Sequence, residues 1–386
     1  MNVKEMDSTY IAHTYGRFPV QLVKGKGSLA WDENGKEYID LGSGIAVNGF
    51  GIADEAWLKA VTEQLHQLPH ASNLYYTEPC AKLAQMLCER TGMKRVFFGN
   101  SGAEANECLI KAARKYAAEK HGPDRYTIVT LKNSFHGRTL TTLSATGQDH
   151  YHELYQPLTP GFAHIAPGDM AALEEIHKNT KVAAVLIECV QGEGGVVPLE
   201  KSFTEALQKF CRDNDVLLAV DEVQTGNGRS GRLYAYMCYD LAPDIVSTAK
   251  GLGGGLPIGA CLLGEKVKDV FAPGDHGSTF GGNPASCAGG VSILSRMDEA
   301  LLEGVRERSR YIFDHLTGAP GVEAVNGLGL MIGIKTAKPA REVVGKCIEN
   351  GVLCLTAKDR VRLLPALNIP MEQLEKAVAV LKEACA

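Results

Sequence analysis

Short apolar runs alternate with helical periods through the middle of this chain. Apolar residues recur at helical spacing between the runs, as in 103–120 and 201–213. The runs are Arg95–Phe98, Thr127–Thr130, Val182–Ile187, Val216–Val220 and Ala260–Leu263. Apolar strands that are separated by helices are typical of a mostly parallel β-sheet with helices on both faces. The pattern therefore predicts an α/β fold.

Beyond about residue 290 the pattern changes to shorter strands mixed with helices. We expect helices at 295–315, 339–350 and 371–384, and strands near 322–326, 330–335, 352–356 and 361–364. Near the N-terminus, two short runs flank Asn34-Gly35, a pair that favours a β-hairpin. Because the central sheet is complete without this hairpin, we predict that the chain is divided into three parts. The first is an N-terminal segment (1–50), the second is a large domain (51–290), and the third is a small α+β domain (291–386) with which the N-terminal segment packs.

Length and charge narrow the classes of function. The chain of 386 residues has room for two or three domains. Its 40 Lys and Arg residues and 45 Asp and Glu residues give a net charge of −5, which argues against binding to nucleic acid or to an anionic membrane. The first residues form no apolar signal core, and no run approaches the roughly 20 apolar residues of a membrane span. We expect a soluble, cytoplasmic protein.

Neither the cysteines nor the histidines form a pattern typical of a metal site. The 11 cysteines are scattered without CxxC spacing, so we interpret them as small core residues in a reducing compartment. His66 and His70 are four residues apart, but Pro69 interrupts the helix that would align them. His150 and His152 alternate in a polar stretch. We therefore expect no metal.

Two charged residues follow buried runs. Asp221 comes directly after Val216–Val220, and the carboxyl ends of strands are where ligands bind in open α/β sheets. Lys250 ends the run 244–249 and opens the glycine-rich loop 251–259. Burial lowers the pKa of a lysine and so favours a Schiff base, while glycines leave room for a cofactor ring. Taken singly, Asp221 could equally be a cap or half of a buried ion pair, and Lys250 a solvated surface residue.

Three further loops carry groups that could bind an anion or a ring. Ser101 and Glu104 have the spacing of a capping box, which leaves the amides of Gly102 and Ala103 free at the positive end of a helix. The loop 132–138 places Phe135 and an arginine at another strand end. A second glycine-rich loop, 278–284, begins with two hydroxyl side chains. An ordinary helix cap and surface loops remain the alternatives for each loop alone.

Together these groups describe a site for pyridoxal 5′-phosphate. Asp221-Glu222-Val223-Gln224-Thr225-Gly226, with Gly228, Arg229 and Gly231, and Ser247-Thr248-Ala249-Lys250-Gly251 resemble the signature of the class III, fold-type I aminotransferases. The resemblance extends from about Tyr15 to the C-terminus. Within the class, Phe135–Thr139, Gly192–Gly195 and Gly42–Val47 are most similar to acetylornithine aminotransferases.

The resemblance implies a role for each residue around the cofactor, which would bind in the large domain. Lys250 would hold it as a Schiff base and move the proton, and Asp221 would pair with the pyridine nitrogen. Val223 and Phe135 would pack on the two ring faces, and Gln224 would reach the ring hydroxyl. The cofactor's phosphate would bind at Ser101, Gly102 and Ala103, and at Thr279 across the interface of a homodimer.

The resemblance also implies substrate contacts. Arg362 would bind the α-carboxylate of glutamate or 2-oxoglutarate, and Glu193 would pair with it while the amino donor is bound. Arg138 would bind the carboxylate of N-acetylornithine, with Tyr15 as a further candidate contact. Ser278 would touch substrate from the neighbouring subunit. Glu188 would support Gln224 or the cofactor without being catalytic.

One position departs from a related branch of the class. Gly44 stands where ornithine aminotransferases have a tyrosine that helps to bind the free α-amino group of ornithine. Its absence favours an acylated donor, because no ammonium group then needs a partner. The apolar neighbours Ile45 and Ala46 would accommodate an acetamide methyl.

The resemblance therefore implies an N-acetylornithine:2-oxoglutarate 5-aminotransferase of arginine biosynthesis, working by a ping-pong cycle. Transamination of ornithine, succinylornithine or 4-aminobutyrate is the alternative within the class. A mutase or decarboxylase on the same fold, and a non-enzymatic protein that kept the fold, are alternatives outside it.

Overall fold

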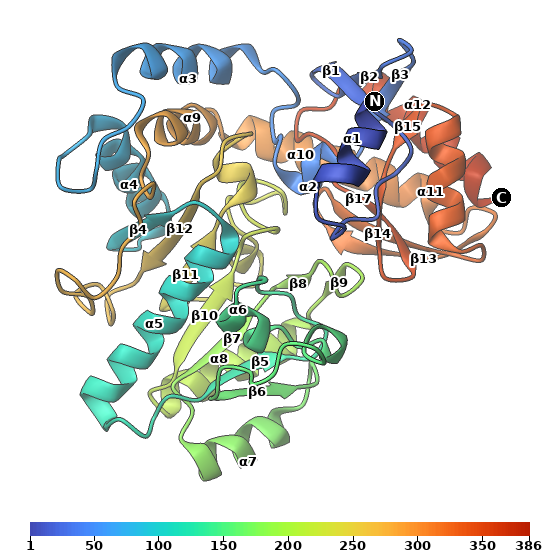
Figure 1. Ribbon diagram of the computed structural model, residues 1–386. Coiled ribbons are helices and arrows are strands. Elements are labelled where there is room, and N and C mark those ends of the chain that lie inside the picture. The colour runs from blue at the N-terminus through green and yellow to red at the C-terminus, as the bar shows by residue number, and fades with distance from the viewer.

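A seven-stranded sheet forms the centre of the large domain in the computed structural model, which describes all 386 residues (Figure 1). The spatial order of its strands is β4 (Arg95–Gly99), β12 (Gly259–Leu263), β11 (Ile245–Thr248), β10 (Leu217–Asp221), β7 (Ala184–Ile187), β5 (Ile128–Leu131) and β6 (Phe162–Ile165). Only β12 runs antiparallel to its neighbours. The predicted mostly parallel sheet is confirmed.

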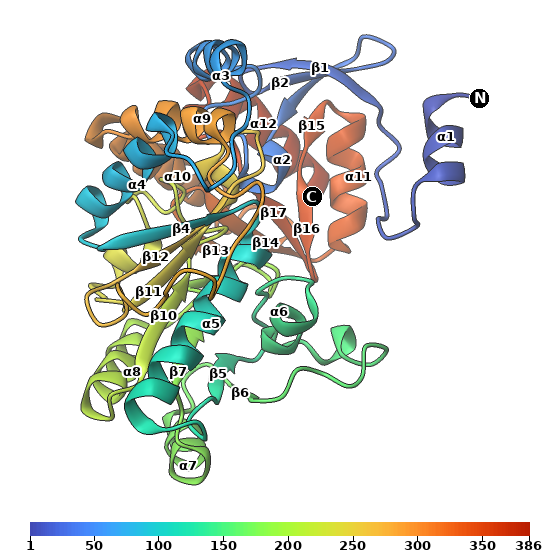
Figure 2. The same ribbon diagram turned by 60° about the vertical axis from the view of Figure 1, so that its left-hand side comes forward.

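Helices cover both faces of this sheet because alternate residues of each strand are apolar on both sides. In β10, Leu218 and Val220 pack in the same core cluster as residues of α8 (Lys201–Asp213). Leu217 and Ala219 point the other way, into the cluster formed with α5 (Gly102–His121). Figure 2 shows the sheet between these two helices. Because helices cover the two faces, the ends of the strands are the parts of the sheet that these helices leave open.

The remaining helices of the large domain lie around this layered centre. Helices α3, α4 and α9 pack together at one end of the sheet (Figure 1). Their bounds and those of the others are α3 (Glu55–Gln67), α4 (Glu78–Thr91), α6 (Leu140–Ala145), α7 (Met170–Thr180) and α9 (Pro284–Ser295). No helix of the chain is both long enough and apolar enough to cross a membrane.

Five apolar runs predict five strands, whereas the sheet has seven. The two further strands are β6, which lies in no predicted run, and β11, which lies within the run 244–249 that precedes Lys250 but is not among the five predicted strands. Strand β6 is an edge strand that includes the polar His164 and is only partly buried, so it lacks a continuous apolar run. Strand β11 ends in the fully buried hydroxyl residues Ser247 and Thr248, which shorten its apolar run.

Two four-stranded sheets form the small domain with helices α10 (Glu299–Leu316), α11 (Ala340–Glu349) and α12 (Met371–Cys385). One sheet has the order β1 (Leu22–Lys26), β2 (Leu29–Asp32), β3 (Glu37–Asp40) and β15 (Val352–Leu353). The other has the order β13 (Val322–Leu328), β14 (Met331–Thr336), β17 (Arg360–Leu363) and β16 (Leu355–Ala357). The hairpin β2–β3 is antiparallel, as Asn34-Gly35 predicts. The division at residues 50 and 290 remains a prediction.

Two predicted elements are split in the structure. The segment 352–356 is not one strand, because β15 pairs with β3 and β16 pairs with β17, with Cys354 between them. The helix predicted at 295–315 is interrupted after Ser295. There α9 ends, and the Asp298 side chain accepts a hydrogen bond from Leu301 N at 2.9 Å to begin α10.

Candidate active site

A cavity of about 260 Å³ lies at the carboxyl ends of the parallel strands. Asp221 is the last residue of β10, Phe135 follows β5, Glu188 follows β7 and Lys250 follows β11. The other lining residues are Gly102, Ala103, Asn106, His136, Gly137, Arg138, Val223 and Gln224. The strand-end positions predicted from the sequence therefore converge on one hollow, as expected for an open α/β sheet.

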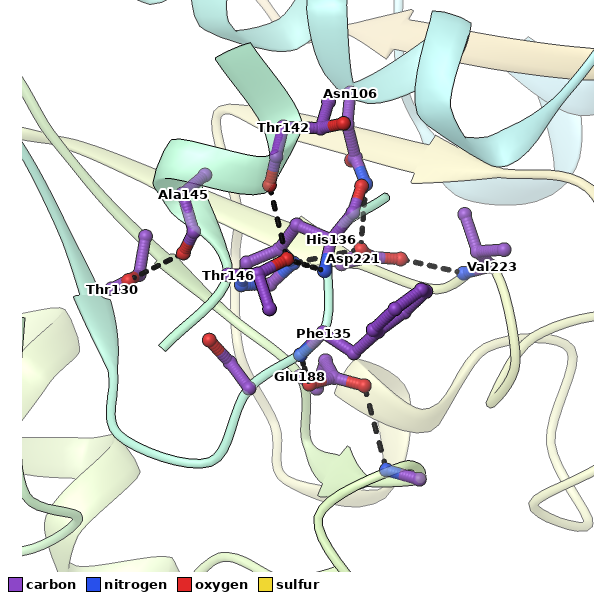
Figure 3. Close-up of polar contacts among 12 residues, drawn as sticks. Asn106, Thr130, Phe135, His136, Thr142, Ala145, Thr146, Glu188, Asp221 and Val223 are labelled. Atoms are coloured by element: carbon purple, nitrogen blue, oxygen red, sulfur yellow. Dashed lines mark hydrogen bonds and ion pairs between the residues drawn. The ribbon is translucent and has the colours of Figure 1, made fainter. Parts of the chain in front are cut away.

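Hydrogen bonds fix the Asp221 carboxylate on both oxygens (Figure 3). Oδ2 accepts from Asn106 Nδ2 at 2.7 Å and lies 2.9 Å from His136 Nδ1, while Oδ1 accepts from Val223 N at 3.0 Å. Because a carboxylate accepts here, His136 carries its ring hydrogen on Nδ1. The carboxylate is nearly fully buried and points into the cavity with its orientation set by three donors.

Sequence reasoning missed the role of Asn106 and His136. His136 lies inside the Phe135–Thr139 motif, but nothing in its spacing indicates Asp221 as its partner. Asn106 is on α5, and its Nδ2 also donates to His136 O at 2.8 Å. A buried asparagine on the otherwise apolar face of a helix was the available signal.

Lys250 begins a short 3₁₀ turn, Lys250–Leu252, with a positive φ of 46°. Burial lowers the pKa of its amine to about 8, although the nearby Glu193 carboxylate acts in the opposite direction. The adjoining segment Ser43–Ala46 is also strained, since all four of its residues have φ between 47° and 63°. Such a left-handed turn costs about 1–2 kcal/mol for each non-glycine residue, so packing must hold it in place.

Helix α5 directs its first amides at the cavity. Ser101 Oγ caps the helix by accepting from Glu104 N at 3.2 Å, and the amides of Gly102 and Ala103 have no intrahelical acceptor. A Cβ atom at Gly102 would lie 2.6 Å from Val223 Cγ1, so only glycine allows this close approach. The predicted capping box is only half formed, because Glu104 Oε2 accepts from Asn100 N at 2.6 Å instead of from Ser101 N.

An ion pair between Glu193 and Arg362 is bonded to the cavity residue Gln224. Arg362, on β17, donates from one nitrogen to Glu193 Oε1 at 2.5 Å and to Gln224 Oε1 at 3.0 Å. Gln224 Nε2 also donates to Glu193 Oε1 at 3.3 Å. Burial opposes the charge on Glu193, but Arg362 outweighs it and lowers the pKa of this carboxyl. We call these three residues the Glu193 gate.

Glu188 ties together two loops that line the cavity. Its Oε2 accepts from Phe135 N at 2.9 Å, and its Oε1 accepts from Gly192 N at 3.4 Å (Figure 3). Burial raises the pKa of Glu188 to about 7. Glu188 therefore lines the cavity and holds its loops through backbone contacts, without a bond to Gln224, and its supporting role for a cofactor remains a prediction.

Six predicted site residues are not among those that line the cavity, namely Tyr15, Ser101, Glu193, Ser278, Thr279 and Arg362. Ser101 caps α5 beside the cavity, and Glu193 and Arg362 bond to the lining residue Gln224. Tyr15 is exposed and stacks with Arg17 in the N-terminal segment that carries α1 (Val3–Tyr10), which stands apart from the rest of the chain in Figure 2. Ser278 Oγ accepts from Asn100 Nδ2 at 3.0 Å, and Thr279 is exposed. The roles of Tyr15, Ser278 and Thr279 remain predictions. Those of Ser278 and Thr279 also require a second copy of the chain.

The residues present fit pyridoxal phosphate. A fixed buried carboxylate, a lysine amine of lowered pKa and the free amides at the start of α5 face one cavity, and these match the ring nitrogen, the aldehyde and the phosphate of this cofactor. The close contact of Gly102 with Val223 brings the amides near the ring-binding side chains. No group of three or more His, Cys, Asp or Glu side chains is placed to hold a metal ion.

Comparison with known proteins agrees with this site. Residues 10–385 match the family described as Aminotransferase class-III. The acetylornithine aminotransferase of Haemophilus ducreyi is 49% identical over 99% of this chain and 98% of that protein. The N-acetylornithine aminotransferase structure from Stenotrophomonas maltophilia has a TM-score of 0.85 at 34% identity, covering 98% of this chain and 97% of the other.

An ornithine aminotransferase structure from Toxoplasma gondii, with pyridoxal phosphate at partial occupancy in its active site, is also similar. It has a TM-score of 0.93 at 34% identity and covers 99% of this chain and 93% of the other.

Proposed function

This chain belongs to the class-III aminotransferase family, and we propose that it transfers the 5-amino group of N-acetylornithine to 2-oxoglutarate. The products are N-acetylglutamate 5-semialdehyde and glutamate, a step of arginine biosynthesis. The observation that carries the proposal is that Asp221 and Lys250 line one cavity together with Gln224, through which Glu193 and Arg362 are joined to the site.

Pyridoxal phosphate is the cofactor of this aminotransferase, and when bound it supplies a ring that withdraws electrons from the reacting substrate carbon. Asp221 would hold the ring nitrogen and keep it protonated, since the carboxylate is fixed and buried. Val223 and Phe135 would pack on the ring. Ser101, Gly102 and Ala103 would bind the phosphate at the positive end of α5.

Lys250 has two tasks, to attach the cofactor and to move a proton at the substrate carbon. Its lowered pKa of about 8 leaves roughly a tenth of the amine neutral at pH 7, against a negligible fraction for a solvated lysine. A neutral amine accepts a proton from the carbon next to the transferred nitrogen and returns it in the reverse half-reaction.

The Glu193 gate lets one site accept two different acids in turn. While the donor is bound, Glu193 neutralises Arg362, so the aliphatic chain of the donor meets no unpaired charge there. When glutamate or 2-oxoglutarate enters, its carboxylate replaces Glu193 on the guanidinium. Arginine suits this exchange because its planar fork binds a carboxylate through two N–H groups.

The donor preference is supported by Arg138 and Gly44. Arg138 lines the cavity and offers its guanidinium to the donor's carboxylate. Gly44 contributes no side chain that could hold a free ammonium group, and the full-length sequence similarity to acetylornithine aminotransferases agrees. The similarity to the Toxoplasma gondii structure makes ornithine the second candidate donor.

A homodimer with shared active sites would complete the arrangement. Leu74, Tyr75, Tyr76 and Phe280 are large apolar side chains that are more than half exposed, beside the loop that holds Ser278 and Thr279. A second copy covering them would bring Thr279 to the neighbour's phosphate site and Ser278 to its substrate. A cytoplasmic location is supported by the 11 free thiols.

Glutamate formation from 2-oxoglutarate tests the donor directly. We expect kcat/KM to be highest for N-acetylornithine when the purified holoenzyme is given this donor, ornithine, N-succinylornithine or 4-aminobutyrate. A higher value for free ornithine would keep the mechanism and overturn the donor. No amino transfer to 2-oxoglutarate from any of the four would overturn the proposed function.

A further inference from the structure

Arg138 differs from the other arginine at the cavity in having no polar partner. Arg362 donates to Glu193 and Gln224, whereas the Arg138 guanidinium makes no hydrogen bond and no ion pair within the chain. Its neighbours are two aromatic rings. The central carbon of the guanidinium lies 4.3 Å from the ring centre of Tyr151 and 5.3 Å from that of Phe135.

Tyr151 reaches this position from a separate segment of the chain. It ends the 3₁₀ turn Asp149–Tyr151, in the stretch between α6 and β6 that loops away from the sheet in Figure 2. Its ring meets that of Phe135 edge-on, with ring centres 6.1 Å apart and an angle of 69° between the planes. Of the two rings beside Arg138, that of Phe135 lines the cavity and that of Tyr151 does not.

The turn that carries Tyr151 is anchored to the loop that carries Phe135 and Arg138. Gln148 Nε2 donates to Ser134 O at 3.0 Å, and Gly147 N donates to Ser134 Oγ at 3.0 Å. Tyr151 N closes the turn by donating to Gln148 O at 3.1 Å. The backbone that carries Tyr151 is thus tied to the loop that carries Arg138.

We propose that Tyr151 is a positioning residue that sets specificity by presenting Arg138 to the carboxylate of the amino donor, an inference that rests on the proposed function. A ring face holds a guanidinium without occupying any of its N–H groups, which lie in its own plane. The free fork then stays available to a donor carboxylate. Without the ring, a long exposed arginine side chain must be ordered anew at each binding event.

Kinetics of matched variants on the holoenzyme separate this role from a merely structural one. We expect Tyr151→Leu to raise the KM for N-acetylornithine by about tenfold with little change in kcat, and Tyr151→Phe, which keeps the ring, to stay within about twofold of the wild type. Tyr155→Leu, an exposed tyrosine four residues further on, is the matched control and leaves all constants unchanged.

A donor without a carboxylate tests whether the change in KM caused by Tyr151→Leu depends on Arg138. The preference for N-acetylornithine over N-acetyl-1,4-diaminobutane, its analogue without the carboxylate, should fall about tenfold in Tyr151→Leu. In an Arg138→Leu background, the same substitution should change the preference by less than about twofold.

The outcomes distinguish this inference from the proposed function. A wild-type protein that does not consume N-acetylornithine contradicts the proposed function, and the inference falls with it. A wild type that consumes N-acetylornithine contradicts the inference alone if Tyr151→Leu leaves the KM for this donor unchanged, or has an undiminished effect in the Arg138→Leu background.

Discussion

Two carboxylates of the site, Asp221 in the cavity lining and Glu193 beside the lining residue Gln224, are held in different ways. Asp221 accepts from a helix side chain, an imidazole and a backbone amide, all within the large domain. Glu193 is held by Arg362 from the small domain and by a longer bond from Gln224, and its side chain is 28% exposed. The first carboxylate cannot leave its partners, whereas a substrate carboxylate can replace the second.

This difference indicates that the two carboxylates have different tasks. Asp221 stabilises charge during catalysis, and Glu193 takes part in substrate recognition. A group that stabilises charge in every half-reaction must be in place before the substrate arrives, because reorganisation would cost catalytic free energy. A group that recognises only one of two substrates must be able to give way to the other. The following variants test this contrast.

Removing the charge of Asp221 should have the largest effect. Asp221→Asn keeps the size of the side chain but no longer stabilises a protonated ring nitrogen, so we expect kcat to fall about 10³-fold or more in both half-reactions. Single-turnover absorbance with each substrate measures this. Equal cofactor content confirms that binding survives, and a loss confined to one half-reaction would contradict the assignment.

Asn106→Ala should weaken both half-reactions equally through Asp221. The substitution removes one hydrogen bond to the carboxylate, which is typically worth about 1.5–3 kcal/mol when the acceptor is charged. We expect kcat to fall about 20-fold with KM values little changed. Asn106→Asp would place a second carboxylate against Asp221, and we expect it to be less active than the alanine variant, not to restore activity.

Glu193→Gln should slow only one of the two half-reactions. The glutamine still accepts a hydrogen bond but no longer neutralises Arg362. We therefore expect the N-acetylornithine half-reaction to slow about tenfold while the glutamate half-reaction is retained. Glu200→Gln, at an exposed residue seven positions further on, is the control. An equal loss in both half-reactions would mean that Glu193 is not a gate.

The pH dependence of cofactor attachment gives the smallest effect. Only the neutral amine of Lys250 reacts, so the rate at which the apoprotein captures pyridoxal phosphate should rise with pH through an inflection near 8. Between pH 7 and pH 8 the rise is about fivefold. Because Glu193 raises the pKa of Lys250, Glu193→Gln should move the inflection to lower pH. A rate that keeps rising past pH 10 would contradict a buried amine.

The sequence predicts the parts of the site that local pattern determines. Asp221 and Lys250 stand at the ends of apolar runs, and the carboxyl ends of parallel strands meet at one edge. The start of α5 is marked by Ser101, whose spacing to Glu104 indicates a helix cap. These features depend on a few consecutive residues, so one amino-acid sequence is enough to predict them.

Other parts depend on contacts between distant segments, which no local pattern contains. Asn106 and Asp221 are 115 positions apart in the sequence, and Arg362 and Glu193 are 169 apart. Tyr151 reaches Arg138 only because the 3₁₀ turn is bonded to the loop at Ser134. The strand break at Cys354 likewise follows from pairing with two different sheets.

The cofactor's visible absorbance in the two separate half-reactions tests the central claim most directly, namely that one site with a fixed and an exchangeable carboxylate serves both acids. We predict that N-acetylornithine bleaches the band of the holoenzyme faster than ornithine does, and that 2-oxoglutarate added afterwards restores it. In Glu193→Gln only the first step slows. A holoprotein without a visible band, or a band that N-acetylornithine leaves unchanged, would contradict the account.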